Sequence, residues 1–366
     1  MLGKKHSYIS RVPESEKWVL ISYLPEVFYH QDNPYYMKVH QNRYEMIRIN
    51  KVFNKLGYNT LIVSYNSTVV PENLNVKIVF GIEPAFVHLS QMYPDAYKIY
   101  YATGAYFKHQ NGMIKKRTDE FNKYFNVNLP YRRMVQEHNS VDIADCILQI
   151  GSQFTLKTYP EKYRQKITII DQSSMNFQKA IQRILKPTRN YIWLGSSGNV
   201  LKGLDLVLNF FISNPQYTLY IVGPMEEEFK KIYSKSITHN IHLCGFVNMD
   251  SCRFMEIAAN CNFLIYPSAS EGMPGSVINL MKLGVIPILS EWASVDDIKS
   301  LGFILNDLDI QSISMAVDWC NSLSDEEINR LSKKCSVYAT KKYSIDNFEK
   351  QFETFISRIS THLYEN

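Results

Sequence analysis

Short, uninterrupted apolar runs alternate along the chain with segments in which apolar residues recur every three or four positions. The first pattern is typical of strands buried on both faces of a parallel sheet, and the second of amphipathic helices. In the first half, helices are expected at 43–56, at 84–94 and at the beginning of 138–151. The strands expected there are 18–24, 59–65, 76–82, 98–104, the end of 138–151, and 166–171.

The same alternation resumes after a polar stretch at 171–190 that ends in Lys-Pro and is expected to be a linker. The strands expected beyond it are 191–195, 217–223, 241–245, 262–267 and 285–290. The helices between and after them are expected at 202–214, 226–235, 250–261, 276–283 and 345–359.

This alternation of strands and helices predicts an α/β protein with two Rossmann-like parallel-sheet domains, 1–172 and 188–345, facing a central cleft. The last helix, 346–366, is expected to pack back on the first domain through an apolar stripe. Ligands of such sheets bind outside the carboxyl ends of the strands. The loops that follow Gly195, Gly223 and Tyr266 should therefore meet at the cleft.

The stretch from Tyr266 to Ser290 reads as strand end, tight loop, short helix, glycine stop and strand. Pro274 suits the first position of that helix, because it has no N–H group to leave unpaired. Residues 271–275 then sit where backbone N–H groups point outward from a helix start, a geometry that attracts anions and phosphates above all. An ordinary crossover turn shaped by glycine and proline is the equally good alternative from these residues alone.

A second candidate is Gly195 to Asp205, which follows a strand and opens a helix. Its small residues allow close approach of a ligand, and Lys202 at the helix start is a suitable partner for a diphosphate. An exposed lysine in a first helical turn is the alternative. The stretch lacks the spacing of a P-loop and is not GxGxxG.

Composition narrows the classes of partner. A net charge of +5 in 366 residues tolerates anionic substrates but does not suggest a nucleic-acid binder. The six cysteines have neither zinc spacing nor a disulfide framework, and no signal or membrane-spanning stretch is apparent, so a reducing cytosol is expected. The basic, aromatic segment 98–133 is explained by a solvated helical face or, less simply, by contact with an anionic membrane surface.

In combination, the glycine loop with Lys202-Gly203, the Val-Gly-Pro strand end at 222–224 and Ser-Glu-Gly-x-Pro at 270–274 resemble the family 4 retaining glycosyltransferases, also called glycosyl transferases group 1. Those enzymes use nucleotide-sugars and have the two-domain GT-B fold. The resemblance covers Tyr191 to Ile359 well and the first half only in general architecture.

The resemblance implies that Lys202 and Glu271 are the catalytic residues, holding the donor diphosphate and the sugar hydroxyls. The implied donor-binding residues are Gly195, Ser196, Lys202, Gly223, Glu271, Gly272, Met273, Pro274, Gly275, Ser276 and Asn279, with His109 after the strand at 98–104 as a candidate contact to the sugar. Neither a metal nor another cofactor is expected, because the lysine and the helix start stabilise charge on the leaving nucleotide.

Two positions depart from the family pattern. The family has an arginine directly after the glycine at 195, where this chain has Ser196. The family also has a second glutamate seven residues after the first, where this chain has Asn279. Losing one cationic contact that strengthens in the transition state would lower the rate on the order of 10²-fold.

The first half is expected to bind the acceptor, with His40 and Glu45 at the start of a helix as candidates. The expected activity is retaining transfer of a hexose-like sugar from a nucleoside diphosphate to a hydroxyl of a bacterial surface glycan or glycolipid. A peripheral position on the inner face of the membrane would suit such an acceptor. The alternatives are a degenerate protein that binds a sugar nucleotide or a partner without turnover, and a nucleotide-sugar epimerase on the same fold.

Overall fold

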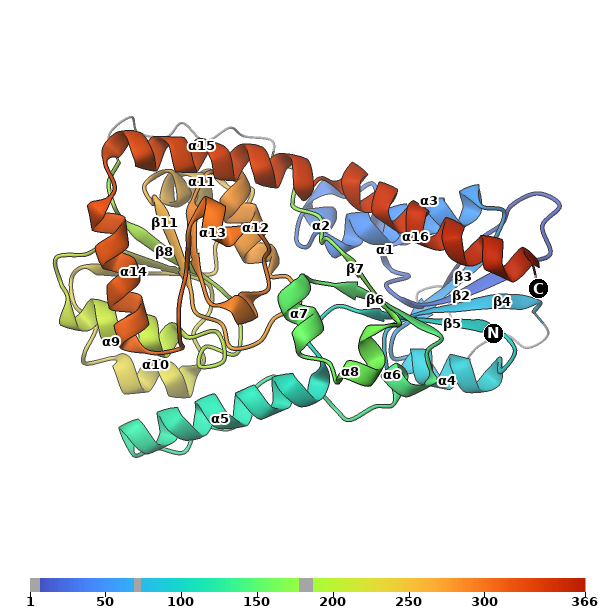
Figure 1. Cartoon of the computed structure of the whole chain (residues 1–366), viewed down its shortest axis with the longest axis horizontal. Coiled ribbons are helices and arrows are strands. Elements are labelled where there is room, and N and C mark those ends of the chain that lie inside the picture. The colour runs from blue at the N-terminus through green and yellow to red at the C-terminus, as the bar shows by residue number, and fades with distance from the viewer. Residues whose placement is uncertain (1–6, 69–73, 178–186, 366) are drawn as a thin grey trace.

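The computed structural model describes residues 7–68, 74–177 and 187–365, which form two α/β domains side by side (Figure 1). In the described residues the first domain has a seven-stranded sheet of order β1-β3-β2-β4-β5-β6-β7, parallel except for the edge strand β1. Its strands are β1 (Ser7–Ser10), β2 (Trp18–Tyr23), β3 (Asn59–Ser64), β4 (Val76–Gly81), β5 (Tyr97–Ala102), β6 (Cys146–Ile150) and β7 (Ile167–Ile170).

The second domain has an all-parallel sheet of order β10-β9-β8-β11-β12-β13. Its strands are β8 (Tyr191–Leu194), β9 (Leu219–Val222), β10 (Ile241–Gly245), β11 (Phe263–Tyr266), β12 (Ile286–Leu289) and β13 (Phe303–Ile304). Every strand predicted from an apolar run is present, and the central strands β8, β11 and β12 are buried along their whole length. The predicted α/β class with two mainly parallel sheets is confirmed.

Helices cover both faces of each sheet. In the first half they are α1 (Val27–His30), α2 (Pro34–Met37), α3 (Asn42–Lys55), α4 (Ala85–Met92), α5 (Phe107–Phe125), α6 (Ser140–Ile143), α7 (Gln153–Lys157) and α8 (Glu161–Arg164). In the second half they are α9 (Leu204–Ser213), α10 (Glu227–Tyr233), α11 (Cys252–Ala259), α12 (Gly275–Lys282), the 3-10 turn η1 (Glu291–Ala293), α13 (Ile298–Leu301), α14 (Ile310–Ser322), α15 (Asp325–Lys342) and α16 (Ile345–Glu365).

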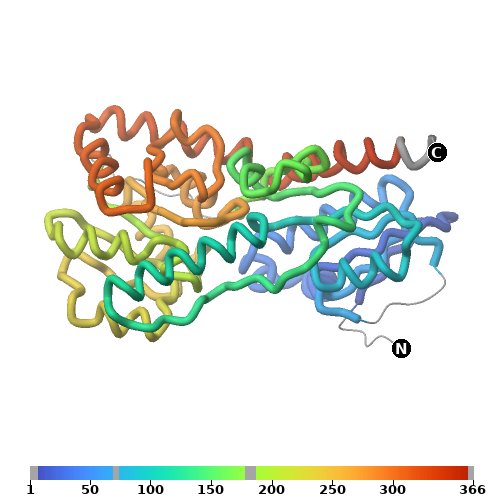
Figure 2. Tube along the Cα trace, turned by 60° about the horizontal axis from the view of Figure 1, so that its bottom comes forward, coloured from blue at the N-terminus to red at the C-terminus, as the bar shows by residue number. Residues whose placement is uncertain are grey.

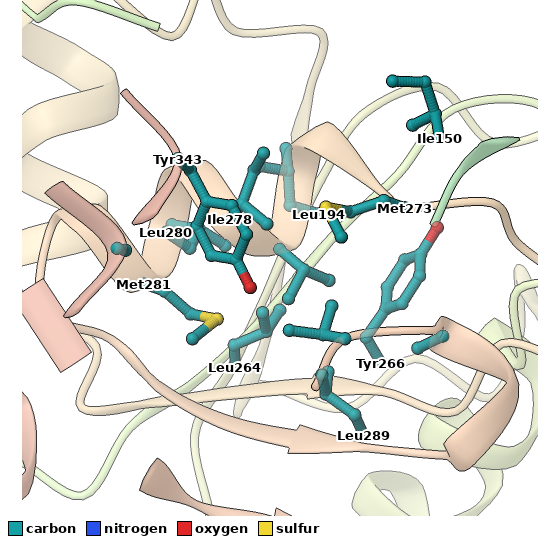
Figure 3. Close-up of a cluster of buried hydrophobic side chains, with 14 of the residues drawn as sticks. Ile150, Leu194, Leu264, Tyr266, Met273, Ile278, Leu280, Met281, Leu289 and Tyr343 are labelled. Atoms are coloured by element: carbon teal, nitrogen blue, oxygen red, sulfur yellow. The ribbon is translucent and has the colours of Figure 1, made fainter. Parts of the chain in front are cut away.

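The apolar side of α12 forms the centre of the second domain's core. Figure 3 shows its side chains Ile278, Leu280 and Met281 gathered over Leu264 and Leu289 of β11 and β12. All five are completely or almost completely buried. This packing fixes the position of α12, and with it the direction in which the first N–H groups of that helix point.

Two long helices connect the domains. α15 runs over the second domain, and α16 continues from it to the first domain (Figure 1). There the Phe352 ring packs edge-on against Phe53 and Phe80. On the opposite side, α5 leaves the first domain and lies along α9 and α10 of the second (Figures 1 and 2). The two domains therefore exchange elements on both sides of the cleft.

The connection between the sheets crosses at residues 171–175, which contact both domains. The backbone N–H of Ser173 donates to Glu45 Oε1 of the first domain at 2.7 Å, and that of Met175 donates to Asn279 Oδ1 of the second domain at 2.8 Å. Residues 178–186 of the expected linker, including the short amphipathic turn read from the sequence, lie outside the described residues.

Candidate functional site

A cavity of about 660 Å³ opens between the carboxyl ends of the two sheets. As expected from the topology, the loops after β8, β9 and β11 meet there. From the second domain it is lined by Leu194, Gly195, Ser196, Lys202, Val222, Gly223, Pro224, Phe246, Val247, Met249, Tyr266, Glu271, Met273, Pro274, Gly275 and Ser276. From the first domain and the crossing segment it is lined by Tyr23, His40, Gln41, Asn42, Glu45, Tyr101, Thr103, Arg133, Ile150 and Gln172.

Two glycines bring the loops after β8 and β9 into direct contact. Gly223 has φ +123°, in the region that favours glycine, and a Cβ there would overlap the carbonyl oxygen of Gly195. A Cβ on Gly195 would in turn overlap the ring of Trp193. Both glycines are therefore required for the close approach of these loops at the edge of the cleft.

Lys202 points into the cleft from the turn before α9. Its side chain is 9% exposed, and its Nζ donates to Ser196 Oγ at 3.3 Å and lies 3.9 Å from Glu271 Oε1. Burial lowers the pKa of Lys202, whereas the carboxylate of Glu271 raises it. A buried ammonium with one carboxylate nearby retains donors for an anionic ligand.

Glu271 is held in the cleft by two hydroxyl groups of its own loop. The Tyr266 hydroxyl donates to Oε1 of Glu271 at 2.8 Å, and the Ser268 hydroxyl donates to the same oxygen at 3.3 Å. Tyr266 and Ser268 are fully buried, so their positions are set by the core. The carboxylate is thus oriented before any ligand binds.

The loop that begins with Glu271 is wedged between the domains. A Cβ on Gly272 would come within 2.5 Å of the Thr103 carbonyl oxygen at the end of β5, and Thr155 Oγ1 donates to the Gly272 carbonyl at 3.0 Å. A Cβ on Gly275 would overlap the amide of Gln41. Gly272 is therefore a packing position rather than part of the cavity lining.

Helix α12 begins at Gly275, and Pro274 lies directly before it in an extended conformation instead of taking the first helical position. Its start has no side-chain cap. The first N–H groups of a helix have no partner within the helix, and they carry its partial positive charge. At Gly275 and Ser276 these groups lie at the cavity, as the anion-binding interpretation of this stretch requires.

The backbone of the loop after β8 is occupied differently. The carboxylate of Glu226 accepts hydrogen bonds from the N–H groups of Gly198 at 2.5 Å and Asn199 at 3.2 Å, and from the Ser197 hydroxyl at 2.8 Å. These donors are already hydrogen-bonded within the protein. The glycine loop supplies Lys202 and Ser196 to the cleft, but not this row of amides.

Glu45 lies on the opposite wall, in α3. It is 1% exposed, and its Oε1 accepts hydrogen bonds from the Ser173 N–H and hydroxyl groups, both at 2.7 Å. Burial raises the pKa of Glu45 to about 7, against the effect of the Ser173 bonds. Next to it, the Tyr101 hydroxyl and Asn42 Oδ1 are buried without a hydrogen-bond partner among the described residues. This wall has polar groups available to a ligand.

His40 lines the same wall, and its Nδ1 accepts from the Asn42 N–H at 3.3 Å. Burial lowers the pKa of His40 against the raising effect of Asn42, and Arg43 lowers it further, so the neutral ring is favoured at pH 7. Because Nδ1 accepts from Asn42, the neutral ring carries its proton on Nε2, which can donate one hydrogen bond to a hydroxyl group.

Two of the expected donor-site residues point elsewhere. Asn279 is fully buried, and its Oδ1 binds the Met175 N–H in the crossing segment. His109, in the first turn of α5, packs against the Trp292 ring at 4.7 Å between centroids and is hydrogen-bonded to the Ala269 backbone. Neither residue is among those that line the cavity.

The cavity also contains residues that the sequence did not single out as site residues. Gln41 contacts the start of α12, Arg133 reaches in from the first domain, and Phe246 after β10 is 78% exposed. Phe246 directly follows the glycine that ends a predicted parallel strand, and this position at the carboxyl edge of the sheet is a signal that would have marked it. Gln41 and Arg133 lie in irregular segments, where no periodicity indicates direction.

The basic segment 98–133 divides into two parts. Lys108, Lys115 and Lys116 are exposed, as expected of a solvated face. Arg117, by contrast, is buried in an ion pair across the domains, with Nη2 2.7 Å from Asp205 Oδ2 of α9. Arg132 pairs with Glu228 of α10 at 3.2 Å. The arginines of this segment therefore attach α5 and the chain after it to the second domain.

A membrane-spanning helix or a metal-binding cluster would each indicate a particular class of protein. Within the described ranges, no helix is long and apolar enough to cross a bilayer. The same ranges contain no group of three or more His, Cys, Asp or Glu side chains arranged to hold a metal ion.

Comparison with known proteins agrees with this geometry. Residues 188–320 match the model of the family Glycosyl transferases group 1, which confirms the family resemblance in the second domain. No curated protein matches the chain. Among solved structures, sucrose-phosphate synthase from Thermosynechococcus elongatus aligns with a TM-score of 0.64 at 10% identity, covering 95% of this chain and 100% of that one.

Two further structures show the same architecture. Anabaena HepE in complex with UDP and glucose aligns with a TM-score of 0.56 at 9% identity over 94% of this chain and 100% of that one. WaaG, a glycosyltransferase involved in lipopolysaccharide biosynthesis, aligns with a TM-score of 0.55 at 12% identity over 92% and 98%. The two-domain fold is the GT-B fold of these glycosyltransferases.

Proposed function

We propose that this protein of GT-B fold is a glycosyltransferase of the group 1 type, and that it transfers a hexose-like sugar from a nucleoside diphosphate to a hydroxyl group of its acceptor with retention at the anomeric carbon. The observation that carries the proposal is the arrangement of Lys202, Glu271 and the uncapped start of α12 around one cavity between the domains. A cation, a carboxylate and free amides at one site match the diphosphate and the hydroxyl groups of a nucleotide-sugar.

The donor would bind along the second domain. Its diphosphate would contact Lys202 Nζ and the N–H groups of Gly275 and Ser276, and Glu271 would accept hydrogen bonds from the sugar hydroxyls. The exposed Phe246 ring offers an apolar surface to the nucleobase. The HepE structure with UDP and glucose shows a nucleotide and a sugar in a protein of the same fold, which supports this class of ligand.

In the proposed reaction, an acceptor hydroxyl attacks the anomeric carbon on the face from which the diphosphate leaves. The bond from that carbon to the diphosphate oxygen breaks, the bond to the acceptor oxygen forms, and the acceptor proton passes to the departing diphosphate oxygen. The products are a nucleoside diphosphate and a glycosylated acceptor. Lys202 and the α12 dipole stabilise the charge that develops on the leaving group, and no protein nucleophile takes part.

The acceptor would lie against the first domain. His40, the Tyr101 hydroxyl and Asn42 Oδ1 provide hydrogen-bonding groups there, and Glu45 adds a carboxyl group of raised pKa. These groups suit the hydroxyls of a glycan or of a lipid-linked sugar. The exposed lysines of α5 would give a glycolipid acceptor's membrane a basic surface to contact.

A second candidate function is binding of a sugar nucleotide without turnover. It is favoured by Ser196, which leaves Lys202 as the cation that the second domain supplies to the cavity. This candidate predicts that a nucleotide stabilises the protein while no donor is consumed.

Incubation with a panel of nucleotide-sugars tests the proposal. Release of nucleoside diphosphate, together with proton NMR of the first-formed product, measures turnover and anomeric configuration. The proposal expects one donor to be consumed with retention. Inversion would overturn the mechanism, and binding without consumption, with acceptors of several classes supplied, would favour the second candidate.

A further inference from the structure

The second domain by itself supplies little net positive charge to the proposed diphosphate site. Lys202 has its Nζ 3.9 Å from Glu271 Oε1, so much of its single positive charge is offset before a ligand binds. Residue 196 is a serine, which accepts a hydrogen bond from Lys202 instead of adding a cation. The amides of Gly198 and Asn199 are bound by Glu226. A diphosphate carries at least two negative charges, so a further cation at this site would strengthen its binding through charge-assisted hydrogen bonds.

Arg133 of the first domain reaches the same site. It lines the cavity together with Ser196 and Lys202, and its Nη1 donates to the Ser197 carbonyl at 3.3 Å. Its charge is close enough to contribute to the lowered pKa of Lys202, after burial and against the influence of Glu271. The guanidinium is therefore next to the loop that carries Lys202, although it comes from the other domain.

The second domain makes room for this side chain. Gly198 has φ +89°, and a Cβ there would come within 2.7 Å of Arg133 Cδ. The stem of Arg133 thus runs over a position that only glycine leaves open. A side chain at 198 would displace the arginine as well as strain the loop.

The backbone around Arg133 is held by α5. The Arg133 carbonyl accepts a hydrogen bond from Gln110 Nε2 at 3.0 Å. The backbone of Val135 exchanges two hydrogen bonds with the Asn111 side chain, at 2.8 and 2.9 Å. Arg133 itself has φ +65°, so the chain turns sharply at this residue. Because α5 is docked on the second domain through the buried pair Arg117–Asp205, the direction of Arg133 is set by both domains.

From this geometry we infer that Arg133 is the second cation of the donor site, binding the diphosphate from the first domain opposite Lys202. The inference rests on the proposed function. It adds that the diphosphate is held between the two domains, so donor binding draws on contacts from both. A guanidinium suits this task, because it offers paired donors to phosphate oxygens.

The test compares binding of a nucleoside diphosphate and its monophosphate by isothermal titration calorimetry. The wild type is first titrated with UDP, GDP, CDP, ADP and dTDP, and the best ligand and its monophosphate are carried forward. Arg133→Ala is expected to weaken the diphosphate by about tenfold or more and the monophosphate less, since a hydrogen bond to a charged group is lost. Arg132→Ala is the matched control, because this neighbouring arginine pairs with Glu228 and does not line the cavity. The affinity of Arg132→Ala for both nucleotides should stay within about twofold of the wild-type affinity.

The double variant Arg133→Ala with Ser196→Arg places a cation on the other side of the site. It is expected to regain most of the lost diphosphate affinity, which a merely structural role of Arg133 would not allow. Wild-type affinity in Arg133→Ala, alongside weakened binding in Lys202→Met, would overturn the assignment of Arg133 and leave the proposed function standing. Absence of binding of every nucleotide to the wild type would instead overturn the proposed function itself.

Discussion

Lys202 Nζ and Glu271 Oε1 lie 3.9 Å apart, in a cavity bounded by the carboxyl ends of two parallel sheets. The lysine comes from the turn before α9 and the glutamate from the loop before α12, so the pair joins two loops that are 69 residues apart in the chain. One partner can neutralise a diphosphate and the other can accept from sugar hydroxyls.

Removal of the Lys202 amine should nearly abolish transfer. Lys202→Met keeps the stem of the side chain and loses the charge that stabilises the leaving diphosphate, so the rate should fall on the order of 10²- to 10³-fold. Initial rates of nucleoside diphosphate release measure the loss. Lys230→Ala, an exposed lysine of α10 in the same domain, should behave as the wild type. Near-normal activity of Lys202→Met would rule out its assigned role.

Glu271 should also control the pH at which activity is lost. Burial lowers the pKa of Lys202, and the carboxylate of Glu271 raises it, so Glu271→Gln lowers the pKa of Lys202 further. The amine then loses its proton at a lower pH. The alkaline limb of the kcat/KM profile should move to lower pH in Glu271→Gln, in addition to a general loss of rate. An unshifted alkaline limb would show that Lys202 is not the group that titrates there.

Glu45 gives the protein a pH-dependent stability. Burial raises its pKa from 4.5 to about 7, so the folded protein binds this proton more tightly than the unfolded chain. Its contribution to stability is complete below about pH 4.5 and is lost as the pH rises through about 7. Glu45→Gln cannot ionise and should be the more stable protein at pH 8, by up to about 3 kcal/mol. Thermal unfolding at pH 6 and pH 8 measures this, and a wild type that is the more stable one at pH 8 would contradict it.

The buried pair between Arg117 and Asp205 should be essential for docking of α5. Arg117→Ala leaves the Asp205 carboxylate buried without its cation, which destabilises by about 3–5 kcal/mol. Urea unfolding measures the change. The exposed pair of Arg132 and Glu228 is the control, and Arg132→Ala should lose no more than about 1 kcal/mol. Equal losses in the two variants would contradict the structural role of the buried pair.

Asn279 should affect folding more than donor binding. Its Oδ1 accepts from the Met175 N–H, and the residue is fully buried outside the cavity lining. Asn279→Glu, which introduces the family residue, places a carboxylate in this buried position and should lower the melting temperature without a gain in transfer rate. A faster variant with an unchanged melting temperature would show that residue 279 reaches the donor after all.

The sequence was sufficient for the parts of the fold that depend on local pattern. Short buried apolar runs bounded by turn residues, such as Phe263–Tyr266, favour strands, and the glycine and proline around α12 mark its limits within one residue. Because carboxyl ends of parallel strands share an edge, the meeting of the loops at Gly195, Gly223 and Glu271 followed from topology.

What the sequence did not indicate depends on contacts between distant segments. Arg117 looks like any basic residue on a helix until its partner Asp205, 88 residues later, is placed beside it. Asn279 has the right position in α12 for a ribose contact, yet its amide is bound by Met175 from the crossing segment. Arg133 lies in an irregular stretch, and its own backbone is in the left-handed region. No periodicity therefore shows where its side chain points.

A nucleotide site at Lys202 is tested most directly by a thermal-shift panel of UDP, GDP, CDP, ADP and dTDP on the wild type and Lys202→Met. The account predicts that one nucleotide stabilises the wild type, by about 2.7 kcal/mol at ~100 times its dissociation constant, and that Lys202→Met loses most of this shift. No stabilisation of the wild type by any of the five at millimolar concentration would contradict a nucleotide site in the cleft, and an equal shift in both proteins would contradict its placement at Lys202.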